Sequence, residues 1–219
     1  ICGRRQSVVE ETASEWRKQF PGRRVDTFGV DIRNAQAVDE MVQSLFESGG
    51  LSGLINNAAG NFVSPTEALS PRAFDAIANI VFHGSFYVTQ AVGKRWIAQA
   101  KAGQWTPVQP YRSVMSIITT WVDTGNPYVV PSAMSKAGVE VMTKSLAIEW
   151  AKYGIRLNAV GPGEIPTEGM SKRQRRIAGI HAYSTACEPG GVTRPTFPPD
   201  VTTPMPSPDF TASLVPSGL

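Results

Sequence analysis

The chain has 219 residues, a formal net charge of +3 and an apolar fraction of 42%, a composition that suits one α/β domain with a substantial core. It contains no run of about 18 apolar residues, so we expect no membrane partner. The basic run at residues 172–176 lacks interleaved aromatic side chains, which favours a solvated surface over a nucleic-acid partner.

The two cysteines, Cys2 and Cys187, lie far apart in the sequence. This spacing predicts neither a disulfide framework nor a metal site. A reducing cytoplasm is the default compartment for such a chain, and we expect a cytoplasmic location.

Strand and helix patterns alternate along the first 160 residues. In chain order the predicted elements are the end of a strand (1–5), a helix (6–20), a strand (25–30), a helix (34–46), a strand (51–57), a long helical segment (71–99), a strand (113–118), a helix (128–153) and a strand (156–160). Asn34 is placed to cap the second helix, and Ser70 followed by Pro71 starts the third. The first helix is expected to have one inner side, formed by Val8, Val9, Thr12, Ala13, Trp16 and Phe20. This alternation predicts a doubly wound parallel sheet of the Rossmann-like α/β class.

The composition changes after about residue 173. From residue 181 onward the chain holds eight of its 17 prolines and no lysine, and no regular periodicity persists. We therefore predict a structured unit over residues 1–173 and an irregular or disordered tail over residues 174–219. A shift of reading frame or a truncation near Gln174 is one hypothesis for the change, and a natural proline-rich extension is the other.

Two stretches carry the chemical information. Residues 54–62 read Leu-Ile-Asn-Asn-Ala-Ala-Gly-Asn-Phe, an apolar strand that runs into two carboxamides and small residues. Residues 131–140 read Pro-Ser-Ala-Met-Ser-Lys-Ala-Gly-Val-Glu and fall on a predicted helix. Together they resemble the short-chain dehydrogenase/reductase family, and the first stretch is similar to that of the 2,4-dienoyl-CoA reductases within it.

The resemblance implies an incomplete sheet. In the family, a first strand and a glycine-rich turn of the form G-x-x-x-G-x-G hold the cofactor's phosphates at the centre of the sheet. No such turn precedes residues 1–5. The resemblance therefore implies that residues 1–173 form a partial dinucleotide-binding domain and that the chain begins part-way through it.

The resemblance also implies a nicotinamide cofactor. Arg4 and Arg5 follow the second-strand position, where arginine accepts a 2′-phosphate, so NADP(H) is favoured over NAD(H). A surface arginine pair is the alternative. The positions that the resemblance assigns to the cofactor are Arg4, Arg5, Asp31, Ile32, Asn57, Ala58, Gly60, Lys136, Pro162, Gly163 and Ile165.

Ser132 and Lys136 are four residues apart and project from one face of the predicted helix. The resemblance implies that this lysine binds the nicotinamide ribose and lowers the pKa of a proton donor. An exposed lysine on an amphipathic helix is the alternative. The family pattern Tyr-x-x-x-Lys has Ser132 here, and Trp121 stands where the dienoyl-CoA reductases carry their active tyrosine. Tyr128, or a water held by Ser132, is left as the source of the proton.

An acyl-CoA thioester is the substrate that the resemblance implies. Asn61 would hydrogen-bond the thioester oxygen and stabilise a dienolate, and Thr119 would contact the reacting carbonyl. The catalytic positions are Asn61, Thr119, Ser132 and Lys136. The substrate-binding positions are Arg33, Phe62, Ser70, Trp121 and Arg173, of which the two arginines suit the CoA phosphates.

The leading interpretation is an NADPH-dependent 2,4-dienoyl-CoA reductase, which serves fatty acid β-oxidation as an auxiliary enzyme. One alternative is a short-chain reductase that acts on another carbonyl or enoyl-thioester substrate. The other is a non-catalytic fragment of such an enzyme. The resemblance further implies a homo-oligomer, a tetramer, in which the two longest helices pack across subunits.

Overall fold

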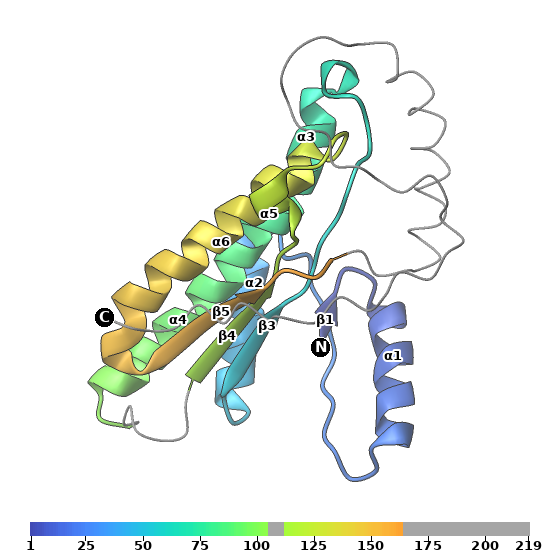
Figure 1. Cartoon of the computed structure of the whole chain (residues 1–219). Helices are drawn as coiled ribbons and strands as arrows, with labels where there is room; N and C mark the ends of the chain where they lie inside the picture. The colour runs from blue at the N-terminus through green and yellow to red at the C-terminus, as the bar shows by residue number, and fades with distance from the viewer. Residues whose placement is uncertain (105–111, 164–219) are drawn as a thin grey trace, which may run out of the picture. The chain divides into compact units, whose positions relative to one another are not determined.

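The computed structural model describes residues 1–104 and 112–163 of the chain, and Figure 1 shows its helices and strands. In chain order the elements are β1 (Cys2–Gly3), α1 (Gln6–Gln19), β2 (Phe28–Gly29), α2 (Ala35–Glu47), β3 (Gly53–Asn56), the 3₁₀ turn η1 (Thr66–Ala68), α3 (Pro71–Ala78), the π-helical turn η2 (Asn79–His83), α4 (Gly84–Lys101), β4 (Arg112–Ile117), α5 (Trp121–Thr124), α6 (Val130–Trp150), the 3₁₀ turn η3 (Ala151–Tyr153) and β5 (Ile155–Val160). The predicted α/β class with a parallel, Rossmann-like sheet is confirmed. The predicted boundary after residue 173 lies outside the described residues.

The strands form two parallel sheets within the described residues. β1 pairs with β2, and Cys2 lies opposite Phe28. β4 lies between β3 and β5, and its Ser116 lies opposite Asn56. The incomplete sheet expected from the sequence is thus present as a pair of strands and a separate set of three.

Alternation along the strands separates the two faces of the three-stranded sheet. One face belongs to the main core, and helices α4 and α6 run along it (Figure 1). Ile55 points to the other face, where its side chain is 66% exposed. The core combines strand residues with large helix residues, namely Val38, Val42, Val88, Val92, Trp96, Val114, Trp150, Ile155 and Leu157.

Two helix starts follow the local signals in the sequence. The Asn34 side chain accepts a hydrogen bond of 3.1 Å from the Ala37 amide at the start of α2. Ser70 Oγ accepts one of 3.2 Å from the Ala73 amide, and Pro71 occupies the first turn of α3. Both caps satisfy amide groups that have no partner inside the helix, and both predictions are confirmed.

The expected inner side of α1 is wrong in part. Val9 and Ala13 are buried, but Val8, Trp16 and Phe20 are 39%, 42% and 54% exposed. The physical reason is the short surface that α1 covers, because among the described residues it packs on the two-residue strands β1 and β2. One turn and a half of helix is enough to cover these strands.

The long helical segment predicted over residues 71–99 contains a π-helical turn that the sequence did not indicate. At this turn the Gly84 amide bonds to the Asn79 carbonyl, five residues earlier. Gly84 also allows a close approach, since a Cβ there would lie 2.6 Å from Ile32 Cδ1. The turn therefore lets α4 pack directly against the end of the β2 segment.

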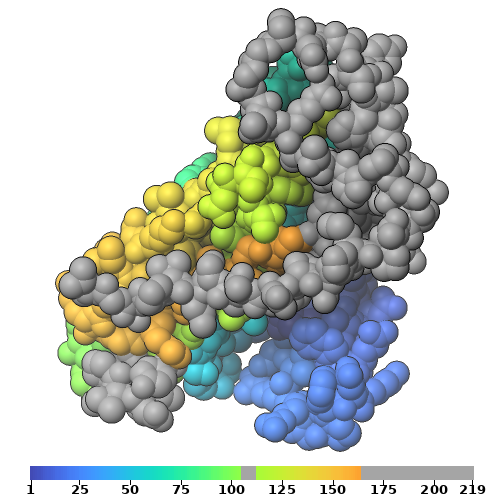
Figure 2. Space-filling view, viewed as in Figure 1, coloured from blue at the N-terminus to red at the C-terminus, as the bar shows by residue number. Residues whose placement is uncertain are grey.

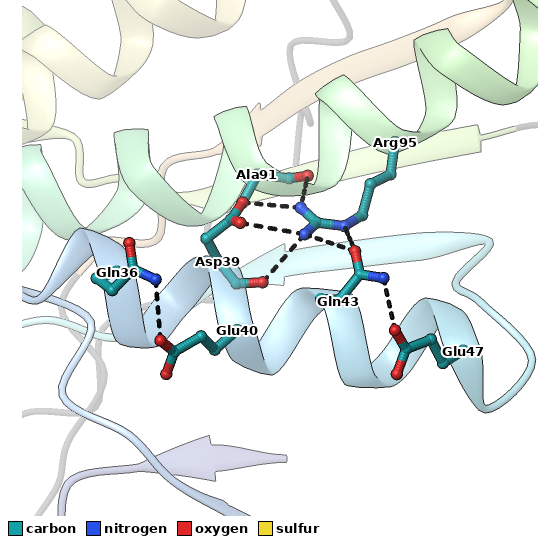
Figure 3. Close-up of polar contacts among 7 residues, drawn as sticks. All are labelled: Gln36, Asp39, Glu40, Gln43, Glu47, Ala91 and Arg95. Atoms are coloured by element: carbon teal, nitrogen blue, oxygen red, sulfur yellow. Dashed lines mark hydrogen bonds and ion pairs between the residues drawn. The ribbon is translucent and has the colours of Figure 1, made fainter.

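Helix α2 is fastened to α4 by one arginine (Figure 3). Arg95 donates to both carboxylate oxygens of Asp39, at 2.9 and 3.2 Å, and also to Gln43 Oε1 and the Ala91 carbonyl. Hydrogen bonding by Arg95 holds the pKa of Asp39 below its ordinary value. Within the described ranges, no helix combines the length and the apolar character needed to cross a bilayer.

Candidate active site

The three strands of the larger sheet end at one edge, as parallel strands do, and this edge is where ligands bind in open α/β sheets. The loops that follow β4 and β5 are in close contact there. A Cβ on Gly161 would lie 3.5 Å from the carbonyl carbon of Thr119 and 3.6 Å from the Thr120 amide nitrogen. Figure 2 shows the neighbouring α5 segment (yellow-green) at the surface beside the end of β5 (orange).

Asn56 fixes the end of β3. Its side chain is buried, and Nδ2 donates to Thr89 Oγ1 at 2.8 Å and to Ser116 Oγ at 3.3 Å. Both hydroxyl residues are 1% exposed. A buried amide with both protons directed at buried hydroxyls anchors the end of β3, from which the segment starting at Asn57 continues.

Lys136 reaches the end of β4 from the second turn of α6. The residue is 7% exposed, and its ammonium donates a hydrogen bond to the Ile117 carbonyl. Burial lowers the pKa of this amine. Ser132 lies one turn earlier on the same helix and is 5% exposed. Asn56 and Lys136 therefore bind two consecutive residues of β4, Ser116 and Ile117.

Asn61 has a buried oxygen with no hydrogen-bond partner among the described residues. An unpaired buried polar atom costs about 1–3 kcal/mol, so native structures supply a partner to almost all of them. A ligand or a water that donates to Asn61 Oδ1 would remove this cost. Phe62, the next residue, is 48% exposed.

The loop after Asn61 is tied to the start of α6. The Ser64 amide donates to the Tyr128 carbonyl at 2.9 Å. Tyr128 has a φ of +66°, and it alone among the described non-glycine residues has a positive φ. The loop that carries Asn61 and the helix that carries Ser132 and Lys136 are thereby joined through backbone.

A second group of site candidates lies where β1 and β2 end. Arg33 forms a two-pronged ion pair with Asp31, in which Nε lies 2.9 and 3.0 Å from the two carboxylate oxygens. This bonding is the main cause that lowers the pKa of Asp31, and the charge of Arg4 contributes. The Val30 amide donates to the Gly3 carbonyl at 3.0 Å, so Arg4 and Asp31 follow directly after two paired residues. Neither Arg4 nor Arg5 makes an ion pair or side-chain hydrogen bond with the described part of the chain.

The remaining predicted positions lie on several elements. Ser70 caps α3, as described above, and Trp121 is the half-buried first residue of α5. Pro162 and Gly163 follow β5 after Gly161, while Ile165 and Arg173 lie outside the described residues. In the described ranges, no three His, Cys, Asp or Glu residues are grouped in a way that could hold a metal ion.

The sequence reasoning missed Asn56, Thr89 and Ser116 as a unit. Asn56 is the first carboxamide of the recognised stretch, so its importance could have been inferred from that position. Thr89 and Ser116 carry no such signal, because they are far from Asn56 in the sequence. Thr89 lies 33 residues after Asn56, and Ser116 lies 27 residues after Thr89. A single hydroxyl on a helix or a strand has no pattern that identifies its partner.

The sequence and fold have known counterparts. A protein of Caenorhabditis elegans named "Probable 2,4-dienoyl-CoA reductase 3 [(3E)-enoyl-CoA-producing]" is 46% identical over 171 residues, which are 77% of this chain and 52% of the relative. A Bacillus subtilis protein named "Probable 2,4-dienoyl-CoA reductase [(2E)-enoyl-CoA-producing]" is 37% identical over 175 residues, 79% of this chain and 65% of the relative. The chain thus spans about half to two thirds of the length of these relatives.

The crystal structure of a short chain dehydrogenase from Bacillus anthracis superimposes on this fold with a TM-score of 0.68. It is 38% identical in sequence, and the match covers 84% of this chain and 76% of that one. The family model described as short chain dehydrogenase matches residues 1–178. These residues include both strand sets and the whole edge where Asn56 and Lys136 meet β4. The chain belongs to the short chain dehydrogenase family.

Proposed function

We propose that the chain is the core of an NADPH-dependent reductase of 2,4-dienoyl-CoA thioesters. The relatives named as such reductases support the substrate class. The observation that carries the proposal is the meeting of two side chains on β4, where Asn56 binds Ser116 and Lys136 binds Ile117. This arrangement sets an ammonium beside the amide-rich loop that begins at Asn57.

Two groups of this edge suit a nicotinamide nucleotide, the cofactor of the family. Lys136 uses one N–H on the Ile117 carbonyl, and its other protons are available to ribose hydroxyls. Asn61 Oδ1 lacks a donor, and ribose hydroxyls and the nicotinamide amide are donors. When bound, the cofactor supplies a hydride. The protein's part is to hold the acceptor and stabilise the charge that forms on it.

Arg4 and Arg5 support NADP(H) as the preferred form. Their guanidinium groups follow β1, and no carboxylate of the described residues lies within ion-pair distance of them. A guanidinium that is not already paired suits the two-pronged binding of a 2′-phosphate. The other residues proposed to bind the cofactor are Asp31, Ile32, Asn57, Ala58, Gly60, Pro162, Gly163 and Ile165.

The proposed substrate contacts start from Asn61. If its oxygen accepts from the cofactor, its amide nitrogen is left to donate to the thioester oxygen, where negative charge develops. Thr119 lies at the same edge and would add a hydroxyl contact. Phe62 is exposed enough to pack on an acyl chain. Arg33, Ser70, Trp121 and Arg173 remain proposed contacts of the acyl-CoA.

The assembly and the compartment are also part of the proposal. Met134, Val141 and Ile148 are 58%, 62% and 83% exposed on α6. They recur every seven residues, so they form one apolar stripe along the helix. Figure 2 shows α6 (yellow) open at the surface. The stripe supports a homo-oligomer, proposed as a tetramer. We propose the cytoplasm as the compartment of the protein. Its proposed role is an auxiliary step of fatty acid β-oxidation.

The test is activity of the full-length protein on 2,4-dienoyl-CoA, 2-enoyl-CoA and 3-oxoacyl-CoA, each with NADPH and with NADH. We expect NADPH oxidation with the dienoyl thioester and a kcat about 10²–10³ lower for Asn61→Ala. Asn158→Ala, an exposed asparagine on β5, is the matched control and should retain wild-type kcat. Preference for 3-oxoacyl-CoA would favour another short-chain reductase. Absence of cofactor binding in calorimetry would favour the non-catalytic alternative.

A further inference from the structure

Reduction of a conjugated thioester by hydride leaves a dienolate, which must take up one proton. The following inference rests on the proposed function, because it concerns the source of that proton. On the segment from the end of β4 to the second turn of α6, the side chains that carry a hydroxyl or an ammonium are those of Thr119, Thr120, Thr124, Tyr128, Ser132, Ser135 and Lys136. Aliphatic hydroxyls and the indole of Trp121 are far too weak as acids near neutral pH, so Lys136 and Tyr128 remain.

Tyr128 is held in a strained backbone conformation. Its φ of +66° places it in the left-handed region, which costs a bulky L-residue about 1–3 kcal/mol. The residue after it, Val129, is 2% exposed and caps α6, so the surrounding structure fixes this conformation. Outliers of this kind gather at functional sites, where the strain serves to aim a side chain.

The position of Tyr128 between the two halves of the site follows from its hydrogen bonds. Its carbonyl accepts from the Ser64 amide, three residues after Asn61. On its other side, the Ser132 amide bonds to the Val129 carbonyl at 3.0 Å in the first turn of α6. Tyr128 thus joins the segment with the proposed thioester contact to the turn with Ser132 and, one turn further, Lys136.

The phenol and the ammonium differ in their surroundings. Tyr128 is half-buried, and its hydroxyl makes no hydrogen bond to any residue in the described part of the chain. The Lys136 ammonium is buried and bound to the Ile117 carbonyl. A general acid must reach the reacting carbon, and a buried amine bound to a strand carbonyl is poorly placed to do so.

We propose that Tyr128 is a catalytic residue and that its phenol donates the proton to the dienolate. The hydride from the cofactor forms one C–H bond and reduces the diene, and the cofactor is oxidised. The Tyr128 O–H bond then breaks as the second C–H bond forms on the dienolate carbon. The electron pair of the O–H bond stays on the phenolate, which takes a proton from water before the next turnover.

The test is Tyr128→Phe in the full-length protein, because phenylalanine keeps the ring and the left-handed backbone. We expect kcat to fall by about 10² or more with little change in KM. The solvent deuterium isotope effect on kcat should change with it, which a merely structural role would not cause. Tyr153→Phe is the matched control, since Tyr153 precedes β5 at the opposite end of the strand and should leave kcat within twofold.

A Tyr128→Phe enzyme whose kcat stays within threefold of wild type, with an unchanged isotope effect, would overturn the proposal. So would a Lys136→Arg enzyme that loses protonation at carbon while Tyr128→Phe keeps it. If the protein reduces 3-oxoacyl thioesters and not dienoyl thioesters, the proposed substrate is wrong. Tyr128 is still tested in that case, because the alkoxide formed from a ketone also requires a proton, and the same fall in kcat is expected.

Discussion

Asn56 Nδ2 lies 2.8 Å from Thr89 Oγ1, so the side chain that ends β3 is bound to helix α4. Its other bond, to Ser116 Oγ, crosses to β4 at the register position directly opposite. The strand end that leads into the proposed cofactor loop is therefore held by two elements distant in sequence. The buried amide thus ties the end of β3, from which Asn57 continues, to both hydroxyls.

Thr89→Val tests this dependence. Valine has nearly the shape of threonine but leaves the Asn56 amide without its shorter bond, so we expect a loss of about 1–3 kcal/mol in unfolding free energy. Urea denaturation measures it. Thr143→Val is the matched control, because Thr143 is also buried but donates only to the Val139 carbonyl of its own helix. Similar losses in the two variants would contradict a special role for Thr89.

Lys136→Met should abolish reductase activity and stabilise the fold. The wild type buries an ammonium, and a methionine of similar length removes the cost of desolvating it. After the lost bond to Ile117 is subtracted, we expect a net gain in unfolding free energy on the order of 1 kcal/mol. Thermal unfolding at neutral pH measures the gain. Lys144→Met, at an exposed lysine paired with Glu140, is the control and should bring no comparable gain.

The gain from Lys136→Met should also depend on pH. Burial lowers the pKa of Lys136 from its ordinary value of 10.5, so between the folded and unfolded pKa values the unfolded chain binds the additional proton. Wild-type stability therefore rises with pH in that window, and the advantage of the methionine variant shrinks toward pH 10.5. An advantage that stays constant over the alkaline range would show that Lys136 does not carry a buried charge.

Local signals in the sequence predicted the helix starts at Asn34 and Ser70, because a cap is read from a few neighbouring residues. They also placed Ser132 and Lys136 on one face of a helix, since that depends only on helical periodicity. The Asn56–Thr89 bond could not be predicted in this way, because it joins residues 33 positions apart. The left-handed conformation of Tyr128 is equally non-local, because intrinsic preference opposes it and the packing around Val129 imposes it.

Gly93→Ala should destabilise the contact between α4 and the end of α6. A Cβ at this position would lie 2.3 Å from Trp150 Cη2 and 2.6 Å from Cζ3, and Trp150 is buried in the core. The ring must shift, at a cost of about 1–3 kcal/mol, although alanine favours a helix more than glycine does. Gly53→Ala is the control, because its nearest contact would be an ordinary 3.8 Å. Equal thermal midpoints for the two variants would contradict the close packing.

Val141→Glu should break the proposed self-association. The substitution places a charge in the centre of the stripe formed by Met134, Val141 and Ile148, and a carboxylate is costly to bury at a helix–helix interface. Sedimentation velocity should show a smaller species than wild type. Val8→Glu makes the same change at an exposed valine of α1 and should leave the sedimentation coefficient unaltered. A wild type that is already monomeric would refute the oligomer.

Arg95→Met should weaken the attachment of α2 to α4 in a pH-dependent way. The guanidinium is largely buried and donates to Asp39, Gln43 and the Ala91 carbonyl. Because Asp39 is half exposed, loss of the guanidinium should lower the unfolding free energy by about 1–2 kcal/mol at neutral pH.

The pKa of Asp39 is lowered from 3.8, chiefly by the hydrogen bond from Arg95. The folded chain then holds fewer protons than the unfolded chain, so this stabilisation is present above pH 3.8 and is lost as the pH falls through the lowered pKa. Urea denaturation at pH 7 and at progressively more acid pH should show the difference between wild type and variant shrinking. Arg24→Met removes an exposed pair with Asp26 and should have a smaller effect at every pH, and equal effects would mean that the Arg95 network is no stronger than a surface ion pair.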